Sequence, residues 1–258
     1  MKVFILCGGY GSRLDNLGKL IAKPMVRIGN DPLLFHIIKN FVDQGFKDFV
    51  LCTGHKEETI SNFFFKENKN FIIKKYNKSK NHTFFQYKKK KFKFNCDIIF
   101  TGLSTATGGR VKIAYEKLNI KEDFMMTYGD GLANVNLKKL VNFHYKKKGL
   151  ITLTAVRPKH KYGVLELIGN KVKSFDDSKS KKSNIFINGG FFVISSKALN
   201  FIINTETFWE NEPLKKSIKL KKVYAFKHEK FWQSVDTLKD LEELKKLFNK
   251  KKLLWKKL

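Results

Sequence analysis

Short apolar runs alternate with helix-patterned segments through the first 149 residues. Strand-like runs occupy residues 2–7, 48–54, 96–102 and 123–131, and each is followed by an amphipathic segment, at residues 33–45, 56–65, 108–118 and 136–149. Strands and helices that alternate in this way predict a mostly parallel sheet with helices on both faces. We therefore expect an α/β, Rossmann-like fold.

The second part of the chain is richer in strands. Strand patterns lie at residues 150–157, 163–169, 170–175 and 184–194, and helical patterns return at 196–203, 209–218 and 237–252. There is no internal repeat and no linker rich in Pro, Gly or Ser, so we expect one continuous domain over residues 1–258. Residues 66–95 interrupt the rhythm with a basic and aromatic stretch. We interpret this stretch as a hairpin whose lysines form a solvated face or a subunit contact.

A glycine-rich loop, Gly8-Gly9-Tyr10-Gly11-Ser12-Arg13, follows the first strand. It is not a dinucleotide fingerprint, because leucine stands where the third glycine belongs, and it is not a Walker A loop, because no lysine follows its last glycine. Glycines allow backbone amides to approach a triphosphate, and Arg13 and Lys23 could neutralise its charge. By itself the loop is equally compatible with a plain turn.

The net charge of +29, from 52 basic and 23 acidic residues, raises the possibility of nucleic-acid binding. Only four of the basic residues are arginine, and the lysines are scattered along the chain instead of forming one stripe. This pattern favours a general compositional bias, so we do not expect a nucleic-acid partner. Two of the four arginines, Arg13 and Arg110, fall in glycine-rich segments, where a planar fork of donors suits phosphate.

Sequence patterns also bear on the cellular compartment. The apolar run at the N-terminus stops at Gly8 without a signal-peptide cleavage site, and no apolar run has the length of a membrane span. The three cysteines form no CxxC pair. We expect free, mostly buried thiols and a cytoplasmic protein with no membrane partner.

Nine segments occur in the order and approximate spacing typical of one family and cover almost the whole chain. They are "LCGGYGSRL", "AKPMVRIG", "FHIIKNF", "TGLSTATGGRVK", "MTYGDGLANV", "TAVRPKHKYGVLEL", "INGGFFVIS", "FWENEPL" and "FWQSVDTLKDLEEL". In these segments the chain resembles the sugar-phosphate nucleotidyltransferases, and among them the cytidylyltransferases that act on glucose 1-phosphate. The resemblance implies the nucleotide-diphospho-sugar transferase fold, with residues 1–149 mainly binding nucleotide and 150–258 mainly binding sugar phosphate.

The reaction implied by the resemblance is formation of CDP-glucose and pyrophosphate from CTP and α-D-glucose 1-phosphate, assisted by Mg²⁺, in a homo-oligomer such as a hexamer. Two alternatives stay open. One is the same transfer with another sugar 1-phosphate or with UTP or dTTP. The other is a catalytically silent protein that binds a nucleotide or nucleic acid.

The resemblance also assigns residues. The catalytic set is Arg13, Lys23, Asp130 and Asp236, of which Asp130 and Asp236 would hold the metal. The nucleotide-binding set is Leu6, Gly8, Gly9, Gly11, Ser12, Arg13, Lys23, Thr105, Gly108, Gly109 and Arg110. The sugar-phosphate set is Tyr128, Gly163, Asp177, Asn188, Gly189 and Trp232.

One departure from the family pattern concerns the sugar. The family has Glu-Lys-Pro after a "SF" strand, whereas this chain has "SFDDSKS", so Asp177 can replace the glutamate but Ser178 stands at the position of the lysine. Lys179 or another lysine of that loop can supply the missing charge, because an ammonium acts as a movable point charge. Otherwise the substrate differs from glucose 1-phosphate.

Overall fold

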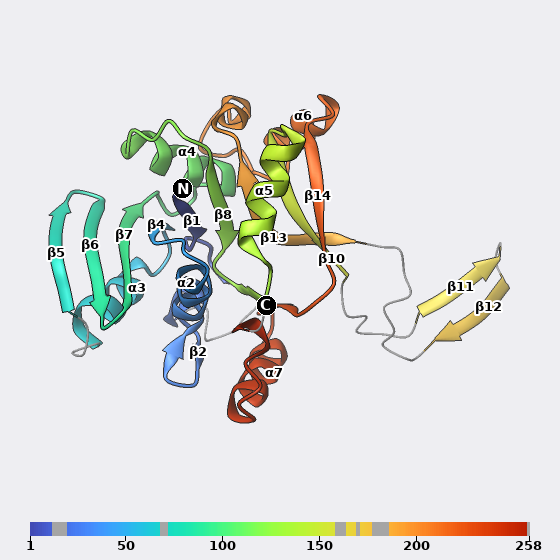
Figure 1. Cartoon of the computed structure of the whole chain (residues 1–258), viewed down its shortest axis with the longest axis horizontal. Helices are drawn as coiled ribbons and strands as arrows, with labels where there is room; N and C mark the ends of the chain where they lie inside the picture. The colour runs from blue at the N-terminus through green and yellow to red at the C-terminus, as the bar shows by residue number, and fades with distance from the viewer. Residues whose placement is uncertain (12–19, 68–71, 158–163, 169–170, 177–185, 257–258) are drawn as a thin grey trace.

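The computed structural model describes residues 1–11, 20–67, 72–157, 164–168, 171–176 and 186–256. These residues build a nine-stranded sheet in the order β14-β10-β13-β8-β1-β4-β7-β6-β5 (Figure 1). Its strands are β1 (Val3–Leu6), β4 (Asp48–Thr53), β5 (Ile72–Ser79), β6 (His82–Lys89), β7 (Phe92–Phe100), β8 (Phe124–Tyr128), β10 (Ile151–Val156), β13 (Ile187–Ile194) and β14 (Val223–His228).

The sheet is mixed but mostly parallel. Among the described strands, β6 and β13 run opposite to the other seven, because each pairs antiparallel with both of its neighbours. The central strands β8, β1, β4 and β7 are all parallel. This arrangement confirms the predicted α/β fold.

Helices cover both faces of the sheet. They are α2 (Leu33–Asp43), α3 (Glu57–Asn62), α4 (Thr107–Lys117), α5 (Leu137–Lys147), α6 (Glu212–Lys219) and α7 (Leu238–Asn249). Alternate residues of β1 enter opposite cores, because successive side chains of a strand point to opposite faces. Val3 and Ile5 pack in the core beneath α2, α5 and α7, whereas Phe4 and Leu6 pack in the core beneath α4. Both cores are therefore anchored on the strand that leads into the glycine loop.

Within the stretch at residues 66–95, the described residues 72–89 form the predicted hairpin. Its strands β5 and β6 pair antiparallel, and β6 pairs with β7, so the hairpin extends one edge of the sheet (Figure 1). The strands predicted near residues 163–175 also form, as β11 (Val164–Ile168) and β12 (Lys171–Asp176). They pair with each other and with no other described strand. The helix expected at 196–203 is a 3₁₀ turn, Ser196–Phe201.

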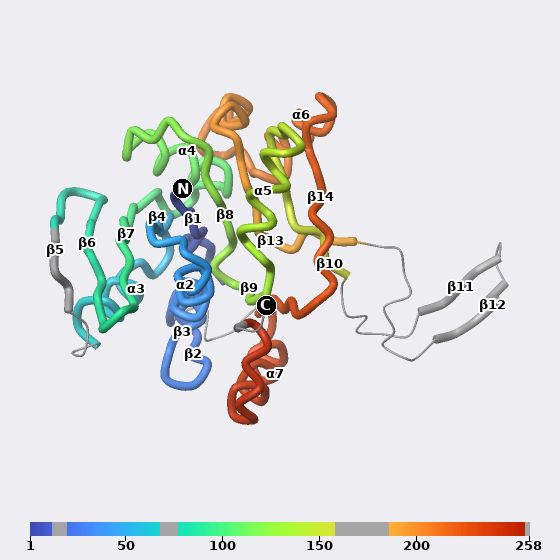
Figure 2. The backbone as a smooth tube through the Cα atoms, in the orientation of Figure 1, coloured from blue at the N-terminus to red at the C-terminus, as the bar shows by residue number. Residues whose placement is uncertain are grey.

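The last helix folds back onto the first half of the chain. In Figure 2, α7 lies beside the turn between β2 (Arg27–Ile28) and β3 (Asp31–Pro32). Gly29, at φ +65°, makes this contact possible, since a Cβ there would come within 2.2 Å of the Phe248 ring. Helix α7 thus carries the residues just before it, including Asp236, towards the N-terminal half.

Among the described residues, no helix combines the length and hydropathy that a membrane span needs. All three cysteines, Cys7, Cys52 and Cys96, are free and buried, as expected from the sequence. Burial raises the pKa of the Cys52 thiol to about 12, although the nearby Arg110 opposes this shift.

Candidate active site

The strand order creates a switch point beside β1. The chain adds β4 and β7 on one side of β1 and then returns to add β8 on the other side. The carboxyl ends of β1 and β8 meet there, with Leu6 paired to Tyr128. In open α/β sheets, ligands bind in the crevice at such a point because the two outgoing loops diverge.

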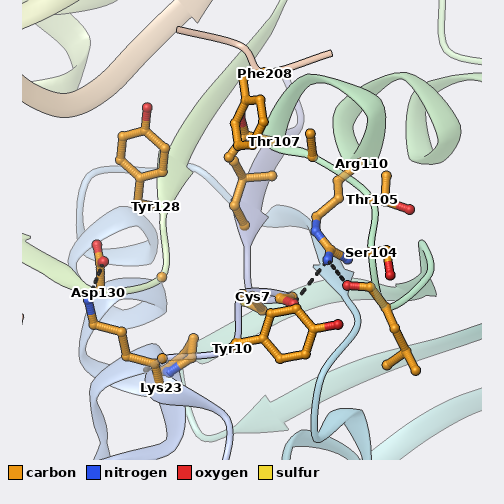
Figure 3. A pocket seen from close by; sticks show the side chains of 18 residues that line it. Cys7, Tyr10, Lys23, Ser104, Thr105, Thr107, Arg110, Tyr128, Asp130 and Phe208 are labelled. Carbon is orange, nitrogen blue, oxygen red and sulfur yellow. Dashed lines mark hydrogen bonds and ion pairs between the residues drawn. The ribbon is translucent and has the colours of Figure 1, made fainter. Parts of the chain in front are cut away.

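A cavity of about 350 Å³ lies at this switch point (Figure 3). Its walls come from the loop after β1, the segment that leads into α4 and the end of β8. Seven residues of the predicted nucleotide-binding set line it: Leu6, Gly8, Gly9, Gly11, Lys23, Thr105 and Arg110. Ser12 and Arg13 lie outside the described residues. The structure thus gathers most of the predicted nucleotide residues around one space.

Arg110, on the first turns of α4, forms part of the cavity wall. Its guanidinium donates to five acceptors: the carbonyl oxygens of Gly8, Thr53, Gly102 and Leu103 and the Thr101 hydroxyl, at 2.7 to 3.0 Å. The side chain joins the end of β4 to the loops that follow β1 and β7. It is 4% exposed, and burial lowers its pKa. Arg110 therefore supports the walls of the cavity. The resemblance assigns it to the triphosphate or to the wall that binds the base, and this assignment stays a prediction.

The glycines of the first loop have different neighbours. A Cβ on Gly8 would come within 2.2 Å of Arg110 Nη1, and one on Gly54 within 2.5 Å of the same atom. A Cβ on Gly9 would meet nothing within 4 Å. Gly8 thus makes room for Arg110, whereas the space in front of Gly9 is open to a ligand.

Gly108 and Gly109, predicted to bind nucleotide, face another part of the chain. A Cβ on Gly108 would come within 2.7 Å of the Thr207 carbonyl oxygen, and one on Gly109 within 2.3 Å of the Thr205 carbonyl oxygen. Gly109 N–H also donates to the Thr207 carbonyl at 3.2 Å. The close approach at this pair of glycines is between α4 and residues 205–209.

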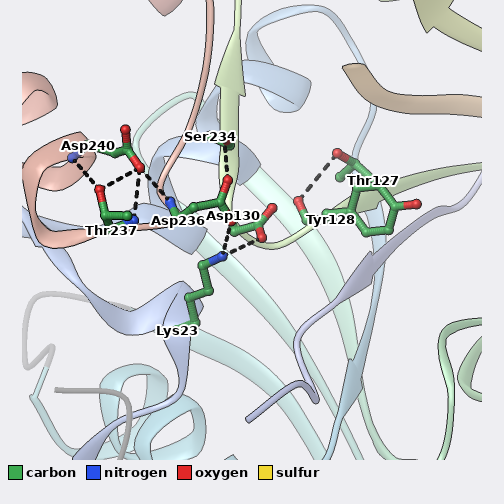
Figure 4. Close-up of polar contacts among 8 residues, drawn as sticks. All are labelled: Lys23, Thr127, Tyr128, Asp130, Ser234, Asp236, Thr237 and Asp240. Carbon is green, nitrogen blue, oxygen red and sulfur yellow. Dashed lines mark hydrogen bonds and ion pairs between the residues drawn. The ribbon is translucent and has the colours of Figure 1, made fainter. Parts of the chain in front are cut away.

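Three charged residues predicted to be catalytic meet in one cluster (Figure 4), and two of them, Lys23 and Asp130, line the cavity. Lys23 Nζ lies 2.8 Å from Asp130 Oδ2 and 3.0 Å from Asp236 Oδ1. The residues come from a turn after the first loop, the end of β8 and the segment before α7. Burial alone would lower the pKa of Lys23, but the two carboxylates raise it above its ordinary value. An ammonium group is therefore held between both acids.

Asp236 is positioned by the start of α7. Ser234 Oγ donates to Asp236 Oδ2 at 2.8 Å, and the Asp236 N–H donates to Asp240 Oδ2 at 3.1 Å. Asp240 also completes a capping box with Thr237, the N-cap residue of α7. Neither Ser234 nor Asp240 was predicted. The Thr-x-x-Asp spacing of "TLKD" was the available signal for Asp240.

A second cavity, of about 490 Å³, adjoins the first. Four residues of the predicted sugar-phosphate set line it: Tyr128, Asn188, Gly189 and Trp232. The Trp232 indole N–H donates to the Gly189 carbonyl at 2.8 Å, which fixes the orientation of the ring. Gly163, Asp177 and Ser178 lie outside the described residues. Tyr128 and Asp130 line both cavities, so the carboxylate pair stands where the two spaces meet.

Glu210 also lines the second cavity, although it was not predicted as a site residue. The Tyr128 hydroxyl donates to one Glu210 oxygen, and the Thr107 hydroxyl donates to the other at 2.8 Å. Burial and the Glu210 carboxylate raise the pKa of Tyr128. The "FWENEPL" segment carried the resemblance, but nothing in its spacing shows that Glu210 reaches Tyr128.

The donor set at Asp130 and Asp236 suits a hard cation. Both are oxygen ligands, and they already surround one positive charge, that of Lys23. The described residues contain no cluster of three or more His, Cys, Asp or Glu side chains that could bind a metal by themselves. Magnesium commonly combines one or two carboxylates with substrate phosphates. The pair fits a metal that binds together with a nucleotide.

A family model described as nucleotidyl transferase matches residues 2–251. The chain belongs to this family. The glucose-1-phosphate cytidylyltransferase of Salmonella typhimurium is 37% identical over 256 residues, which are 99% of each chain. The protein from Bacillus subtilis named as a probable glucose-1-phosphate cytidylyltransferase is 34% identical over 259 residues, with the same coverage. These matches make the chain a sugar-1-phosphate nucleotidyltransferase.

Solved structures of low sequence identity share the fold of this nucleotidyl transferase. A UDP-glucose pyrophosphorylase in complex with UDP-glucose superimposes with a TM-score of 0.68 at 17% identity, covering 97% of this chain and 98% of the other. HddC from Yersinia pseudotuberculosis gives a TM-score of 0.68 at 21% identity, covering 96% and 99%. The mostly parallel sheet with flanking helices is therefore that of the sugar nucleotidyltransferases.

Proposed function

We propose that this nucleotidyl transferase forms CDP-glucose and pyrophosphate from CTP and α-D-glucose 1-phosphate. The identities of 37% and 34% over the full length to proteins named as glucose-1-phosphate cytidylyltransferases support this choice of substrates. The site also has the two adjoining spaces that a transfer between two substrates needs.

The observation that carries the proposal is the convergence of Lys23, Asp130 and Asp236. Asp130 and Asp236 are 107 and 213 positions from Lys23 in the sequence, yet a carboxylate oxygen of each lies within 3.0 Å of Lys23 Nζ. Phosphoryl chemistry needs little covalent help from the protein but requires charge neutralisation and alignment. Asp130 and Asp236 would hold a divalent cation where the two cavities join, and the Lys23 ammonium would then be available to phosphate, so that together they would meet that requirement.

In the proposed reaction, a phosphate oxygen of the sugar 1-phosphate attacks the α-phosphorus of CTP. A new bond forms between that oxygen and the α-phosphorus, the bond to the bridging α,β-oxygen breaks, and pyrophosphate leaves. The loop from Gly8 to Gly11 presents backbone to the nucleotide, and Lys23 neutralises phosphate charge. When bound by Asp130 and Asp236, Mg²⁺ would supply further positive charge and help to align the phosphates.

The second cavity is the proposed sugar site. Asn188 and the backbone of Gly189 offer hydrogen-bonding groups at its edge, and Trp232 offers a fixed apolar ring. Sugar rings have both apolar faces and hydroxyl edges, so this combination suits them. Because Asp130 lines both cavities, the anomeric phosphate of a sugar bound here would point towards the carboxylate pair.

A substrate panel tests the assignment directly. Pyrophosphate release is measured for CTP, UTP, dTTP, GTP and ATP, each with glucose 1-phosphate and with other sugar 1-phosphates, in the presence of Mg²⁺. We expect the highest kcat/KM for CTP with glucose 1-phosphate. A preference for UTP or dTTP would overturn the choice of base, and a preference for another sugar would implicate the Ser178 departure.

A matched pair of variants tests the site itself. Asp130→Asn removes one charge from the pair, and we expect transfer to fall by about 10³-fold, in line with the loss of a major electrostatic contact. Asp31→Asn is the control, because Asp31 also pairs with a lysine, Lys39 at 2.5 Å, but lines neither cavity. Near-normal turnover of folded Asp130→Asn would contradict the assignment of Asp130 as a catalytic residue.

We also propose that the protein acts as a homo-oligomer, as the resemblance implies. Light scattering of the purified chain should give a mass that is a multiple of 30.1 kDa. A hexamer is the expected state, and a stable monomer with full activity would contradict it.

A further inference from the structure

Three large apolar side chains are exposed around the first cavity, the one at the switch point beside β1. Tyr10, Leu103 and Phe208 line this cavity, and their exposed fractions are 54%, 52% and 53%. They come from the loop after β1, the segment between β7 and α4, and the segment before α6. Exposed apolar groups that converge on one cavity mark a binding surface more often than isolated ones do.

The backbone that carries Phe208 is fixed. Trp209 is fully buried in the core beneath α4, and its N–H donates to the Thr107 hydroxyl at 2.8 Å. Ala106 N–H donates to the Thr205 carbonyl at 2.9 Å. Together with the close approach at Gly108 and Gly109, these contacts bind residues 205–209 to the start of α4. The residues on either side of Phe208, Thr207 and Trp209, are thus both hydrogen-bonded to α4, and this fixes the backbone of Phe208 at the cavity.

One side of the cavity carries the accessible charges, and the other combines aromatic rings and hydroxyls with the buried Arg110, whose donors are taken by protein oxygens. In Figure 3, Lys23 and Asp130 lie on one side, whereas Tyr10, Ser104, Thr105 and Phe208 surround the rest of the space. A nucleoside triphosphate has the same polarity, with a charged tail and a planar base. Its phosphates match the side that carries Lys23, which leaves the base against the apolar groups.

We propose that Phe208, with Tyr10 and Leu103, forms the apolar wall against which the nucleobase packs. This inference rests on the proposed function, because it requires a nucleotide in this cavity. Every base has an aromatic face, so contact with Phe208 increases affinity for any base. The hydroxyls of Ser104 and Thr105 line the same cavity, and that of Thr105 can accept from the base, because it donates to the Thr101 carbonyl at 2.6 Å. Phe208 is thus a determinant of nucleotide affinity that the family resemblance did not assign.

The test compares ligands with and without a base. Calorimetry in Mg²⁺ buffer measures the binding of CTP, UTP, ATP and inorganic tripolyphosphate to the wild-type chain, to Phe208→Ala and to Phe208→Tyr. For Phe208→Ala we expect the affinity of each nucleotide that binds the wild type to fall about tenfold, roughly 1.4 kcal/mol, with tripolyphosphate unchanged. Phe208→Tyr keeps the ring and should bind as the wild type does.

The control variant is Ile218→Ala, which removes an equally exposed apolar side chain, 54%, that lines neither cavity. It should leave all affinities unchanged. Unaltered nucleotide affinity in Phe208→Ala would overturn the proposal, and so would an equal loss for tripolyphosphate. Failure of the proposed substrates appears separately, as binding of UTP or ATP in preference to CTP, and the comparison with tripolyphosphate still tests the wall.

Discussion

Two basic residues line the first cavity and differ in their partners, which are neutral oxygens for one and carboxylates for the other. Arg110 is 4% exposed and donates to neutral oxygens at the end of β4 and in the loops after β1 and β7. Lys23 is more accessible and is paired with two carboxylates, Asp130 and Asp236. One cation is part of the frame of the cavity, and the other belongs to a cluster of charges at its edge.

The difference separates a constant contact from an exchangeable one. The acceptors of Arg110 are groups of the protein itself, so a bound ligand need not change them. The acceptors of Lys23 are the two side chains that we propose to hold Mg²⁺. A metal ion bound to both acids would repel the ammonium, which would then be available for phosphate. The comparison therefore predicts that removing Lys23 affects catalysis and that removing Arg110 affects folding.

The largest expected effect is that of Lys23→Met, which keeps the bulk of the side chain and removes its charge. We expect the rate of transfer to fall by about 10²- to 10³-fold, because neutralisation of phosphate charge is lost. Stability should change by less than about 1 kcal/mol, since the ion pairs are partly exposed. Without the competing ammonium, binding of Mn²⁺ in the absence of nucleotide should become roughly tenfold tighter.

Steady-state kinetics, denaturant unfolding and titration of Mn²⁺ by electron paramagnetic resonance measure these three quantities. Weaker Mn²⁺ binding in Lys23→Met would show that the lysine helps to organise the carboxylates instead of competing with the metal. In that case Lys23 would not leave the two carboxylates when the metal binds, and its contacts would be as constant as those of Arg110.

Arg110→Met should have the reverse profile. The substitution removes one donor from five acceptors, of which the Gly8 and Thr53 carbonyls keep a backbone donor each. An unpaired buried acceptor costs about 1–3 kcal/mol, so the other three lead us to expect a loss of about 3 kcal/mol or more in the free energy of unfolding. Urea denaturation followed by circular dichroism measures it. An unchanged unfolding midpoint together with a sharply raised KM for CTP would instead place Arg110 in direct contact with the nucleotide.

The smallest expected effect separates the two glycines of the first loop. Gly9→Ala adds a methyl group where nothing lies within 4 Å, so stability should change by less than about 0.5 kcal/mol while nucleotide affinity falls about tenfold. Gly8→Ala is the matched variant and should lose stability, because its Cβ overlaps the Arg110 guanidinium. Unchanged nucleotide affinity in Gly9→Ala would show that no ligand approaches this glycine.

Much of the fold follows from local patterns. The alternation of apolar runs and amphipathic helices predicts the central parallel strands, and the apolar spacing of residues 33–41 together with Gly45 places helix α2 and its end. The hairpin at residues 66–95 was also predicted, but its attachment to β7 was not, because strand pairing depends on contacts remote in sequence.

The site was predictable where a residue lies in one of the motifs that carry the resemblance. Lys23, Asp130 and Asp236 were assigned from motif resemblance, and the fold brings them together. Glu210, Ser234 and Asp240 were missed. Glu210 meets Tyr128 across 82 positions, which no local pattern indicates, and Ser234 and Asp240 act by hydrogen bonding to the neighbouring Asp236. The assignment of Arg13 stays a prediction.

The sequence alone determined the family, the α/β architecture and the residue types that phosphoryl chemistry requires, because these follow from local periodicity and from ordered motifs. Only the tertiary structure decided what each glycine accommodates: Gly8 faces Arg110, Gly109 faces Thr205, and Gly9 faces open space. The reason is physical. A glycine in the sequence shows only that a side chain is absent. Which group approaches that position depends on segments about a hundred or more residues away, and only the packed fold brings them near.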